Sequence, residues 1–489
     1  MFTFDNSYAR LPEAFFERIA PTPVSDPTLI KVNKSLALQL GLDAKFLTGL
    51  SASNFFSGNE ISQGSEPIAM AYSGHQFGGW NPQLGDGRAV LLGEVVDQFG
   101  VRQDVQLKGS GRTRFSRSGD GRAWIGPVLR EYVISEAMQA LNIPTTRALA
   151  VVMTGENVYR EQRVPGAILT RVSRSHIRVG TFQYFVARND LDALKTLADY
   201  VIERHFPELK DAQNPYLGLL ESMVSRQAAL IALWMGVGFI HGVMNTDNTL
   251  ISGETIDYGP CAFMDAYDPN TVFSSIDHMG RYSYGNQPHI GQTNCAYFAS
   301  CLLPLISSDE DEARESAIDA LNTYEETYKA AWAVELNAKI GLASIFEGDA
   351  QLGDDLLDCM ARHKVDFTQT FRALTYIVKD NTAQEVELLK SFKDDVAFKD
   401  WLSRWRTRLT LDGTNGKIRQ AAMQGKNPAY IPRNHQVEAM IAAALDENFE
   451  PFETLLDVLE TPFEDRADYQ DYQHPPAVVN DRYQTFCGT

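Results

Sequence analysis

Two polar side chains between His241 and Pro260 could together bind a metal ion and a phosphate. This stretch has the sequence HGVMNTDNTLISGETIDYGP, in which Asn248 and Asp257 flank an expected tight hairpin with a short strand at 249–251. An amide oxygen and a carboxylate suit Mg²⁺, which takes one or two protein ligands and completes its coordination with water and phosphate oxygens. The stretch therefore predicts a magnesium site that also holds a nucleotide.

The same stretch has the spacing of the catalytic loop of protein kinases. From His241 to Asn248 it matches H-x-D-x-x-x-x-N, and Asp257 with the two residues after it takes the place of D-F-G. Val243 stands where a kinase has its base, and a valine cannot accept a proton. Two interpretations stay open: either the protein is catalytically inactive, or another carboxylate is the base, for which Asp247 is the candidate.

Two glycine-rich segments upstream predict backbone that turns sharply or lies against a ligand. The first is YSGHQFGGW at 72–80, followed closely by GDGR at 85–88, and the second covers 109–126 and is also rich in arginine. Glycine pairs in turns are more often structural than functional. These segments alone are therefore weak indicators of a site.

A lysine and a glutamate follow in the order that a kinase small lobe shows. Lys108 ends a predicted strand at 104–108, and Glu131 lies on a predicted amphipathic helix at 128–141. Singly, each residue is more often a surface charge. Together they match the ion pair with which kinases hold a lysine against phosphates.

Two arginines are placed to border the same cleft. Arg171 lies at the end of a predicted strand, 166–172, and Arg178 lies in the loop after it. Guanidinium groups can hold a terminal phosphate by bidentate hydrogen bonds. Solvated arginines are the more common alternative.

The order of the predicted elements favours an α+β protein. Further strands are predicted at 89–96 and 148–153, and helices at 191–206, 216–239 and 294–306, with an irregular segment at 266–291 and helical periodicity up to about 459. This order indicates a two-lobed protein-kinase-like fold with a small β-rich lobe and a mostly helical large lobe. The expected parts are an N-terminal extension at 1–65 with one helix near 35–42, the small lobe at 66–165, the large lobe with the catalytic loop at 166–345, and a helical C-terminal extension and tail at 346–489.

The charge, the apolar segments and the cysteines limit which partners and which cellular compartment we expect for this protein. A formal net charge of -19 disfavours nucleic acid and anionic membrane surfaces as partners, because both attract clustered Lys and Arg. No segment approaches the roughly 18 to 20 apolar residues of a membrane span, and the N-terminus lacks a secretory or transit pattern. Five cysteines without a C-x-x-C pair indicate neither a zinc site nor a disulfide scaffold, so we expect a reduced, cytoplasmic protein.

Several longer strings resemble the selenoprotein O family of protein adenylyltransferases. They are LKGSG at 107–111, GDGRA at 119–123, LREY at 129–132, IPTTR at 143–147, HGVMNTDN at 241–248 and DYGP at 257–260. The resemblance covers about 72–306 and extends to the C-terminal cysteine. It implies a kinase-like fold that binds ATP in a flipped orientation, so that AMP passes to a Ser, Thr or Tyr hydroxyl of a protein and pyrophosphate leaves.

The resemblance also implies roles for single residues. Lys108, Arg171 and Arg178 would hold the phosphates, with Glu131 positioning Lys108; Gly85, Gly87, Arg88, Asp120, Gly121 and Asp257 would contact ATP; Asn248 and Asp257 would bind Mg²⁺, or Mn²⁺ in its place; and Asp247 would accept the proton. On this interpretation the base has moved along the loop from the position of Val243 because the reacting phosphorus has moved.

The last implied feature is a redox contact near the C-terminus. Some family members have selenocysteine where this chain has Cys487, and the resemblance pairs Cys487 with Cys261, so that oxidation would latch the tail over the site. Two free thiols are the alternative in a reducing cytosol.

Alternatives remain for the activity and its partners. The expected partners are proteins with accessible hydroxyls, with neither nucleic acid nor membrane, and a monomer is expected. UTP with manganese is an open alternative to ATP. A conventional kinase that transfers the γ-phosphate and a non-catalytic pseudokinase scaffold are the competing functions; the joint presence of Lys108, Glu131, Asn248 and Asp257 disfavours the scaffold.

Overall fold

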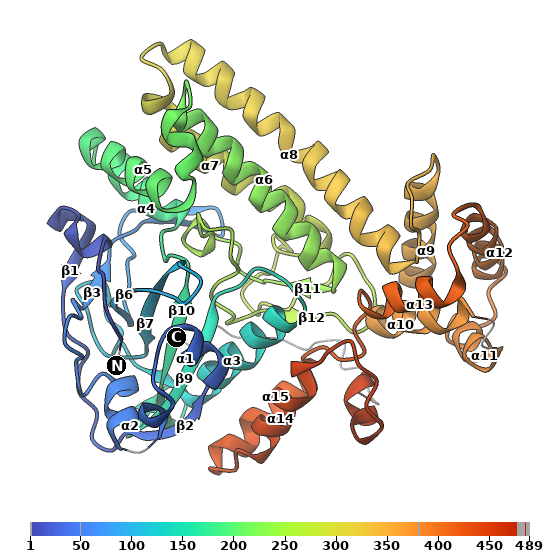
Figure 1. The fold of residues 1–489 in the computed structure, drawn as a ribbon, viewed down its shortest axis with the longest axis horizontal. Helices are drawn as coiled ribbons and strands as arrows, with labels where there is room; N and C mark the ends of the chain where they lie inside the picture. Colours follow the sequence, from blue (N-terminus) through green and yellow to red (C-terminus); the bar gives the residue numbers. More distant parts are fainter. Residues whose placement is uncertain (1, 49, 380–381, 477–484, 486–489) are drawn as a thin grey trace.

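The computed structural model describes residues 2–48, 50–379, 382–476 and 485. These residues form a mixed α/β structure in which a sheet stands at one side and helices make up most of the remainder (Figure 1). Of the helices in these ranges, none combines the length and the apolar character needed to cross a bilayer.

The main sheet is antiparallel and takes strands from widely separated parts of the chain. Its order is β1 (Phe16–Arg18), β3 (Ile68–Met70), β6 (Ala89–Val96), β7 (Arg102–Lys108), β10 (Arg163–Ser173), β9 (Arg147–Tyr159) and β2 (Thr28–Val32), and β8 (Ala123–Trp124) pairs with β10. The strands predicted from the sequence within 89–172 are confirmed. The short strands β1 and β2 were not predicted, and they place residues of the first 65 at both ends of this strand order.

Helices cover both faces of the sheet. Alternate residues of a strand point to opposite faces, so neighbouring residues of β10 pack against different helices. On β10, Ile168 and Val172 pack with the N-terminal helices α1 (Lys34–Gln39) and α2 (Leu50–Ser57). Ala167 and Leu169 pack instead with helix α3 (Ile125–Ala140) and the late helices α14 (Asn434–Leu445) and α15 (Glu450–Glu460). Both faces of β10 are therefore buried against helices.

The helices that follow the sheet are organised around α6 (Pro215–Gly236), which is mostly apolar and is capped by Asn214. It packs against α7 (Gln287–Ile306) and α8 (Glu310–Lys339), and α4 (Val179–Val186) and α5 (Leu191–His205) lie between these helices and the sheet (Figure 1). The helices predicted at 191–206 and 216–239 are confirmed as α5 and α6, and the helix predicted at 294–306 lies within α7.

Helix α7 begins earlier than predicted, inside the segment that was expected to be irregular. The side chain of Gln287 donates to the carbonyl of Phe239 and accepts from the amide of His241, both at 2.9 Å. These contacts are with residues almost fifty positions earlier in the chain. The local sequence therefore gave no sign of them.

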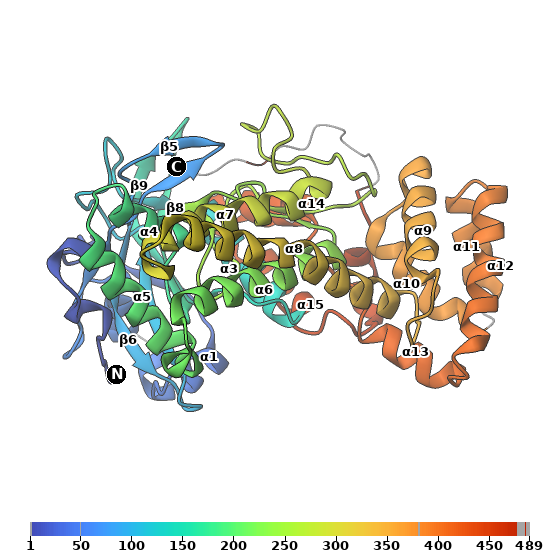
Figure 2. The same cartoon turned by 90° about the horizontal axis from the view of Figure 1, so that it is seen from above.

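The chain after α8 forms two groups of helices. Helices α9 (Asp349–His363), α10 (Phe367–Ile377), α11 (Thr382–Ser391), α12 (Val396–Leu411) and α13 (Gly416–Gln424) gather on the side away from the sheet (Figures 1 and 2). Helices α14 and α15 return to pack on α3. The C-terminal part of the chain thus helps to fix a helix that borders the sheet.

A buried arginine, Arg433, fixes the start of α14 to other parts of the chain. Arg433, just before α14, is completely buried and pairs with Asp265 and with Asp366, whose Oδ2 lies 2.9 Å from its Nη1. Its Nε and Nη2 also donate to the carbonyl oxygen of Gln473. One side chain therefore connects three separate segments of the chain.

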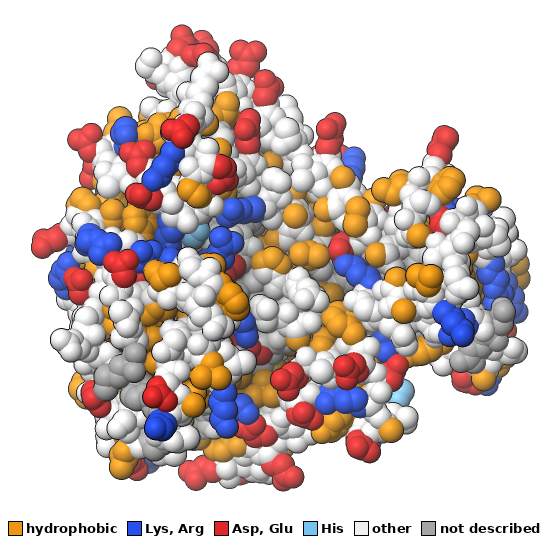
Figure 3. Space-filling view, in the orientation of Figure 1, with side chains coloured by type: hydrophobic (Ala, Val, Ile, Leu, Met, Phe, Trp, Pro, Cys, Tyr) orange, Lys and Arg blue, Asp and Glu red, His pale blue; other side chains and the backbone are white. Residues whose placement is uncertain are grey.

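The surface in Figure 3 agrees with the negative net charge but is not uniform. Acidic side chains are scattered around its periphery, whereas Lys and Arg gather in a band at the left, below α5. Local positive charge therefore exists on an acidic protein, as a phosphate-binding function would need.

We predict that Arg433→Ala strongly destabilises the fold. Removing one partner of a buried ion pair leaves uncompensated charge and typically costs about 3–5 kcal/mol. Denaturant unfolding followed by circular dichroism measures this free energy of unfolding. The exposed Arg314→Ala on α8 is the matched control, and equal stabilities of the two variants would contradict the anchoring role.

Candidate active site

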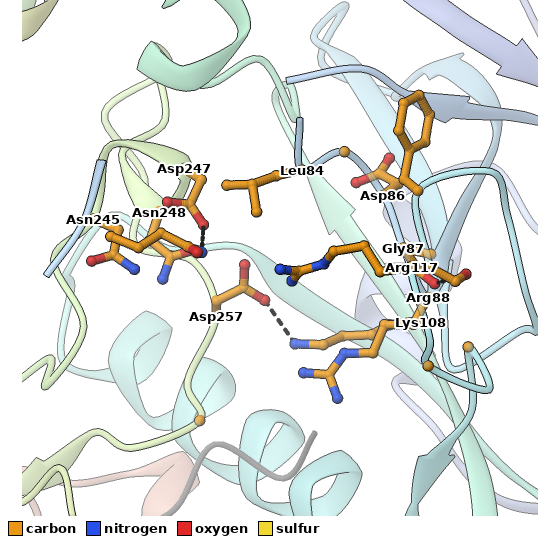
Figure 4. A pocket seen from close by; sticks show the side chains of 18 of the residues that line it. Leu84, Asp86, Gly87, Arg88, Lys108, Arg117, Asn245, Asp247, Asn248 and Asp257 are labelled. Atoms are coloured by element: carbon orange, nitrogen blue, oxygen red, sulfur yellow. Dashed lines mark hydrogen bonds and ion pairs between the residues drawn. The ribbon is translucent and has the colours of Figure 1, made fainter. Parts of the chain in front are cut away.

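A cavity of about 620 Å³ lies where the ends of β6, β7 and β10 meet the loop that follows β11 (Phe239–Ile240). Of the predicted site residues that the structure describes, its lining includes all except Glu131 and Cys261: Gly85, Gly87, Arg88, Lys108, Asp120, Gly121, Arg171, Arg178, Asp247, Asn248 and Asp257. In Figure 4, Asp257 lies between the Asp247 loop and Lys108, and Arg117 reaches in from the same side as Lys108. Residues that are far apart in the sequence therefore line one cavity.

The loop that carries the predicted metal ligands is not the expected hairpin. Strand β11 pairs with β12 (Ala262–Phe263), outside the polar loop, while residues 246–248 form a single 3₁₀ turn and Leu250 bridges to Arg178. The predicted strand at 249–251 is wrong because this segment pairs with a distant residue instead of folding back on itself. Asn248 and Asp257 nevertheless line the same cavity.

Lys108, the last residue of β7, contacts two carboxylates. Its Nζ lies 2.5 Å from Oε2 of Glu131 and 2.7 Å from Oδ1 of Asp257. Glu131 is buried on α3, and a buried carboxylate is tolerated only when it is paired. The two residues predicted to pair are therefore in direct contact, and the contact ties α3 to the sheet.

Two arginines complete this cluster of charges. Nη1 of Arg171 lies 2.9 Å from Oδ1 of Asp257 and 3.1 Å from Oε1 of Glu131, and Nη1 of Arg178 lies 3.3 Å from Oδ2 of Asp257. Both arginines are almost completely buried, so neither is a solvated surface charge. Arg178 also lies over the ring of Tyr72, 4.4 Å from its centroid, which favours a cation further.

Asp257 combines an unusual backbone angle with a charge that this cluster stabilises. Although burial disfavours its charged form, Lys108, Arg171 and Arg178 hold the pKa of Asp257 well below its usual range. Its φ of 62° lies in the left-handed region, which Asp adopts more readily than most residues. The turn thus aims a permanently charged carboxylate at the cavity.

Asn248 is held by the main chain of its own loop. Its amide Nδ2 donates to the carbonyl oxygen of Val243 at 3.1 Å, which leaves the amide oxygen as the group that could bind a cation. Within the described ranges, no group of three or more His, Cys, Asp or Glu side chains is placed to hold a metal ion. The donor set fits a hard cation that takes one amide and one carboxylate oxygen and draws its other ligands from phosphates and water.

Asp247 is a buried carboxylate beside this pair. Its Oδ2 accepts a hydrogen bond of 2.9 Å from Nε2 of Gln76, and its Oδ1 is buried without a hydrogen-bond partner in the part of the chain that the structure describes. Burial raises the pKa of Asp247 to about 6, with Arg178 opposing the shift. A carboxylate in this state can accept a proton near neutral pH.

The glycines at 85 and 87 are required by close packing. A side chain at Gly85 would place its Cβ 2.4 Å from the ring of Phe115, and at Gly87 it would lie 2.9 Å from the carbonyl oxygen of Phe115. Gly85 also has a φ of 87°. The glycine turn therefore lets two chain segments lie together at the edge of the cavity.

Asp120 and Gly121 lie at the outer rim. Asp120 is exposed and pairs with Arg160 at 2.8 Å, and Gly121 packs against the main chain of Gly111 with a φ of 70°. Arg160 lines the cavity but was not singled out from the sequence. It lies in an ordinary turn between two strands, so no local pattern marks it.

Other cavity residues were also missed by sequence reasoning. Asp86 is 2% exposed, and one of its oxygens lies 3.9 Å from Arg178. Burial raises the pKa of Asp86. Gln76 and Arg117 line the cavity as well, and the glycine-rich composition around them was their only sequence signal.

The predicted redox pair is only partly visible. Cys261 is buried next to Pro260, and Cys487 lies outside the described residues. Thr485, which is described, donates from Oγ1 to the carbonyl oxygen of Pro260 at 2.6 Å. The chain near its C-terminus therefore reaches the wall of the cavity, while the pairing itself stays a prediction.

Basic side chains that face amide and carboxylate oxygens across one cavity are suited to binding phosphates, and the buried carboxylate of Asp247 lies beside them. The comparisons with known proteins agree. The sequence profile of a family described as "Protein adenylyltransferase SelO" matches residues 1–460. The chain therefore belongs to the SelO family.

Similar proteins occur in several bacteria and carry the name "Protein nucleotidyltransferase YdiU". The one from Rhodopseudomonas palustris strain BisB5 is 57% identical over 490 residues, covering 100% of this chain and 99% of the relative. Those from Bradyrhizobium diazoefficiens and Rhizobium rhizogenes are 56% and 58% identical, covering 100% and 99% of this chain and 99% and 97% of the relatives. These similarities extend over the full length and identify a nucleotidyltransferase.

We predict that Glu131→Gln weakens nucleotide binding and also lowers the free energy of unfolding, because Glu131 is one partner of a buried ion pair. The substitution keeps the size of the side chain but removes the charge that holds Lys108 and Arg171, so the affinity for ATP should fall roughly 10-fold, as for other positioning residues. Isothermal titration calorimetry measures the affinity. Glu221→Gln on α6 is the matched control, and unchanged binding by Glu131→Gln would contradict the positioning role.

Proposed function

We propose that this protein transfers AMP from ATP to Ser, Thr or Tyr hydroxyls of other proteins. The observation that carries the proposal is the cavity in which Lys108, Arg171 and Arg178 meet Asp257, with Asp247 and Asn248 on the facing loop. Membership in a family described by adenylyl transfer supports the choice of AMP. The names of the relatives support protein acceptors.

The proposal includes a two-lobed, kinase-like arrangement with the site between the lobes. The sheet with α3 corresponds to the small lobe, and the helices around α6 correspond to the large one. The pairing of Lys108 with Glu131, and the positions of Asn248 and Asp257, support this comparison. Residues 16–18 and 28–32 would then belong to the small lobe as edge strands.

The proposed orientation of ATP is flipped relative to a kinase. Val243 lines the cavity at the position of the kinase base, and its side chain cannot take a proton. Asp247, four residues later, has a buried oxygen without a partner among the described residues and a pKa raised to about 6. In the family that the chain resembles, a base at this position accompanies reaction at the α-phosphorus, and this resemblance supports the flipped orientation.

The chemical step transfers one phosphorus centre. The oxygen of the acceptor hydroxyl forms a bond to the α-phosphorus, the bond from that phosphorus to the oxygen bridging to the β-phosphate breaks, and pyrophosphate leaves. The hydroxyl proton passes to the carboxylate of Asp247. Lys108, Arg171 and Arg178 neutralise the charge that gathers on the phosphates, which is the main contribution a protein makes to such a transfer.

A divalent ion completes the proposed site. Asn248 and Asp257 would hold Mg²⁺, or Mn²⁺, which when bound supplies positive charge to the phosphate oxygens. Asp257 also contacts all three cations, and so fixes its own turn relative to them.

The transferred group distinguishes adenylyl transfer from phosphate transfer. With ATP labelled at the α-phosphate, we expect label in proteins of a whole-cell lysate whose own enzymes have been inactivated by heat; with ATP labelled at the γ-phosphate, we expect none. Autoradiography of the separated proteins measures both. Label from the γ-position alone would identify a conventional kinase, and label from neither position would favour a scaffold.

We predict that Asp247→Ala lowers the rate of AMP transfer by roughly 10² to 10⁴-fold, because general-base catalysis contributes this much. Nucleotide binding should change little, since Lys108, Arg171 and Arg178 remain. Transfer kinetics and calorimetry measure the two properties, with the exposed Asp319→Ala as control. Normal turnover by Asp247→Ala would exclude Asp247 as the base.

We predict that the affinity for ATP depends on the metal through Asn248. Chelation of divalent ions should weaken ATP binding to the unmodified protein, whereas Asn248→Ala should bind ATP weakly with or without Mg²⁺. Calorimetric titrations with Mg²⁺ and with EDTA measure the effect. Asn270→Ala, at an exposed position, is the control, and a full Mg²⁺ response by Asn248→Ala would contradict the assignment.

A further inference from the structure

A small hairpin outside the main sheet holds the loop that carries Asp247. Strands β4 (Gly74–Gln76) and β5 (Gly79–Asn81) pair with each other and are separate from the main sheet. The two residues between them, Phe77 and Gly78, both have positive φ, of 50° and 83°, as a tight two-residue hairpin turn requires. The glycine-rich segment 72–80 is thus a defined structural element whose role the chemistry described so far does not explain.

Three consecutive residues of this hairpin each contact the Asp247 loop. The amide of His75 donates to Oγ1 of Thr246 at 2.8 Å, Nε2 of Gln76 donates to Oδ2 of Asp247 at 2.9 Å, and the amide of Phe77 donates to Oδ1 of Asn245 at 3.1 Å. The loop is therefore held at three successive positions. Only the contact from Gln76 reaches the carboxylate.

The hairpin also controls the space around the other carboxylate oxygen. A Cβ at Gly74 would lie 2.6 Å from Oδ1 of Asp247, so any larger residue at this position would clash with this oxygen. Oδ1 is the oxygen that is buried without a partner in the described ranges. The hairpin thus fixes one oxygen of Asp247 by a hydrogen bond and leaves the other unbound.

The hairpin itself is firmly anchored. The ring of His75 stacks on Tyr297 of α7 with centroids 4.0 Å apart, and its Nδ1 lies 2.9 Å from Nε2 of Gln183 on α4. Gln183 also accepts from Oγ1 of Thr246 at 2.7 Å. A hydrogen bond from such an anchored hairpin can define the orientation of Asp247, whereas one from a mobile loop could not.

From this geometry we propose that Gln76 is a positioning residue for Asp247. Its amide holds Oδ2 and so fixes the orientation of the carboxylate that takes the acceptor proton, and it acts on the reaction only through that carboxylate. This inference rests on the proposed function, because it assumes that Asp247 is the base. It adds a residue to the site and gives the β4–β5 hairpin a role in catalysis.

The test compares substitutions at two glutamines of the same segment. Gln76→Ala removes the hydrogen bond, and Gln76→Glu keeps the size of the side chain but removes the donor. Gln83→Ala, at an exposed residue outside the cavity lining, is the matched control. For each variant, kcat and KM of AMP transfer, the Kd for ATP and the thermal midpoint are measured.

We expect kcat to fall roughly 10- to 100-fold in both Gln76 variants, the range typical of residues that orient a reacting group. The Kd for ATP and the thermal midpoint should stay close to those of the unmodified protein, and Gln83→Ala should behave normally. Wild-type kcat in Gln76→Glu would overturn the proposal, because a residue that only fills space tolerates this change. A parallel loss of ATP affinity would overturn it too.

A double-mutant comparison separates this inference from the proposed function. If Gln76 acts through Asp247, adding Gln76→Ala to Asp247→Asn should cause no further loss of the residual rate. A further 10-fold loss would contradict the positioning role while leaving Asp247 as the base. Normal turnover by Asp247→Asn itself would instead refute the proposed base, whatever the effect of Gln76→Ala.

Discussion

The ion cluster around Asp257 is the interaction on which the site depends. Lys108 comes from β7, Arg171 from β10, Arg178 from the start of α4 and Glu131 from α3, and all but Glu131 contact the carboxylate of Asp257. Buried charges are costly unless they are paired, so the sheet, α3 and the loop after β11 must come together for any of them to be stable. The three cations therefore meet at one carboxylate at the wall of the cavity, where phosphates could also reach them.

Helices outside the cavity hold α3, the helix that carries Glu131 of this cluster. Helices α14 and α15 pack on α3, and Arg130, next to Glu131, donates to the carbonyl oxygen of Cys261 and pairs with Glu438 of α14. Arg433 fixes the start of α14 by its pairs with Asp265 and Asp366. The C-terminal helices therefore hold the helix that carries Glu131, although they lie outside the cavity.

The sequence predicts the parts of the site that depend on spacing within one segment. Lys108 at a strand end, Glu131 on a helix, and Asn248 and Asp257 in one polar loop all line or border the cavity because strand ends and polar stops have recognisable local patterns. The parts that depend on distant partners could not be predicted in this way. Gln76 contacts Asp247 across 171 residues, and the edge strands β1 and β2 are too short to show alternation.

The orientation of the nucleotide is the central claim, and a crystal structure with Mg²⁺ and an ATP analogue that resists cleavage between the α- and β-phosphates tests it most directly. The account predicts a metal ion bound to Asn248 and Asp257, phosphates against Lys108, Arg171 and Arg178, and the α-phosphorus as the phosphorus closest to the carboxylate of Asp247. A γ-phosphorus closest to Asp247, or a nucleotide bound outside the cavity, would contradict it.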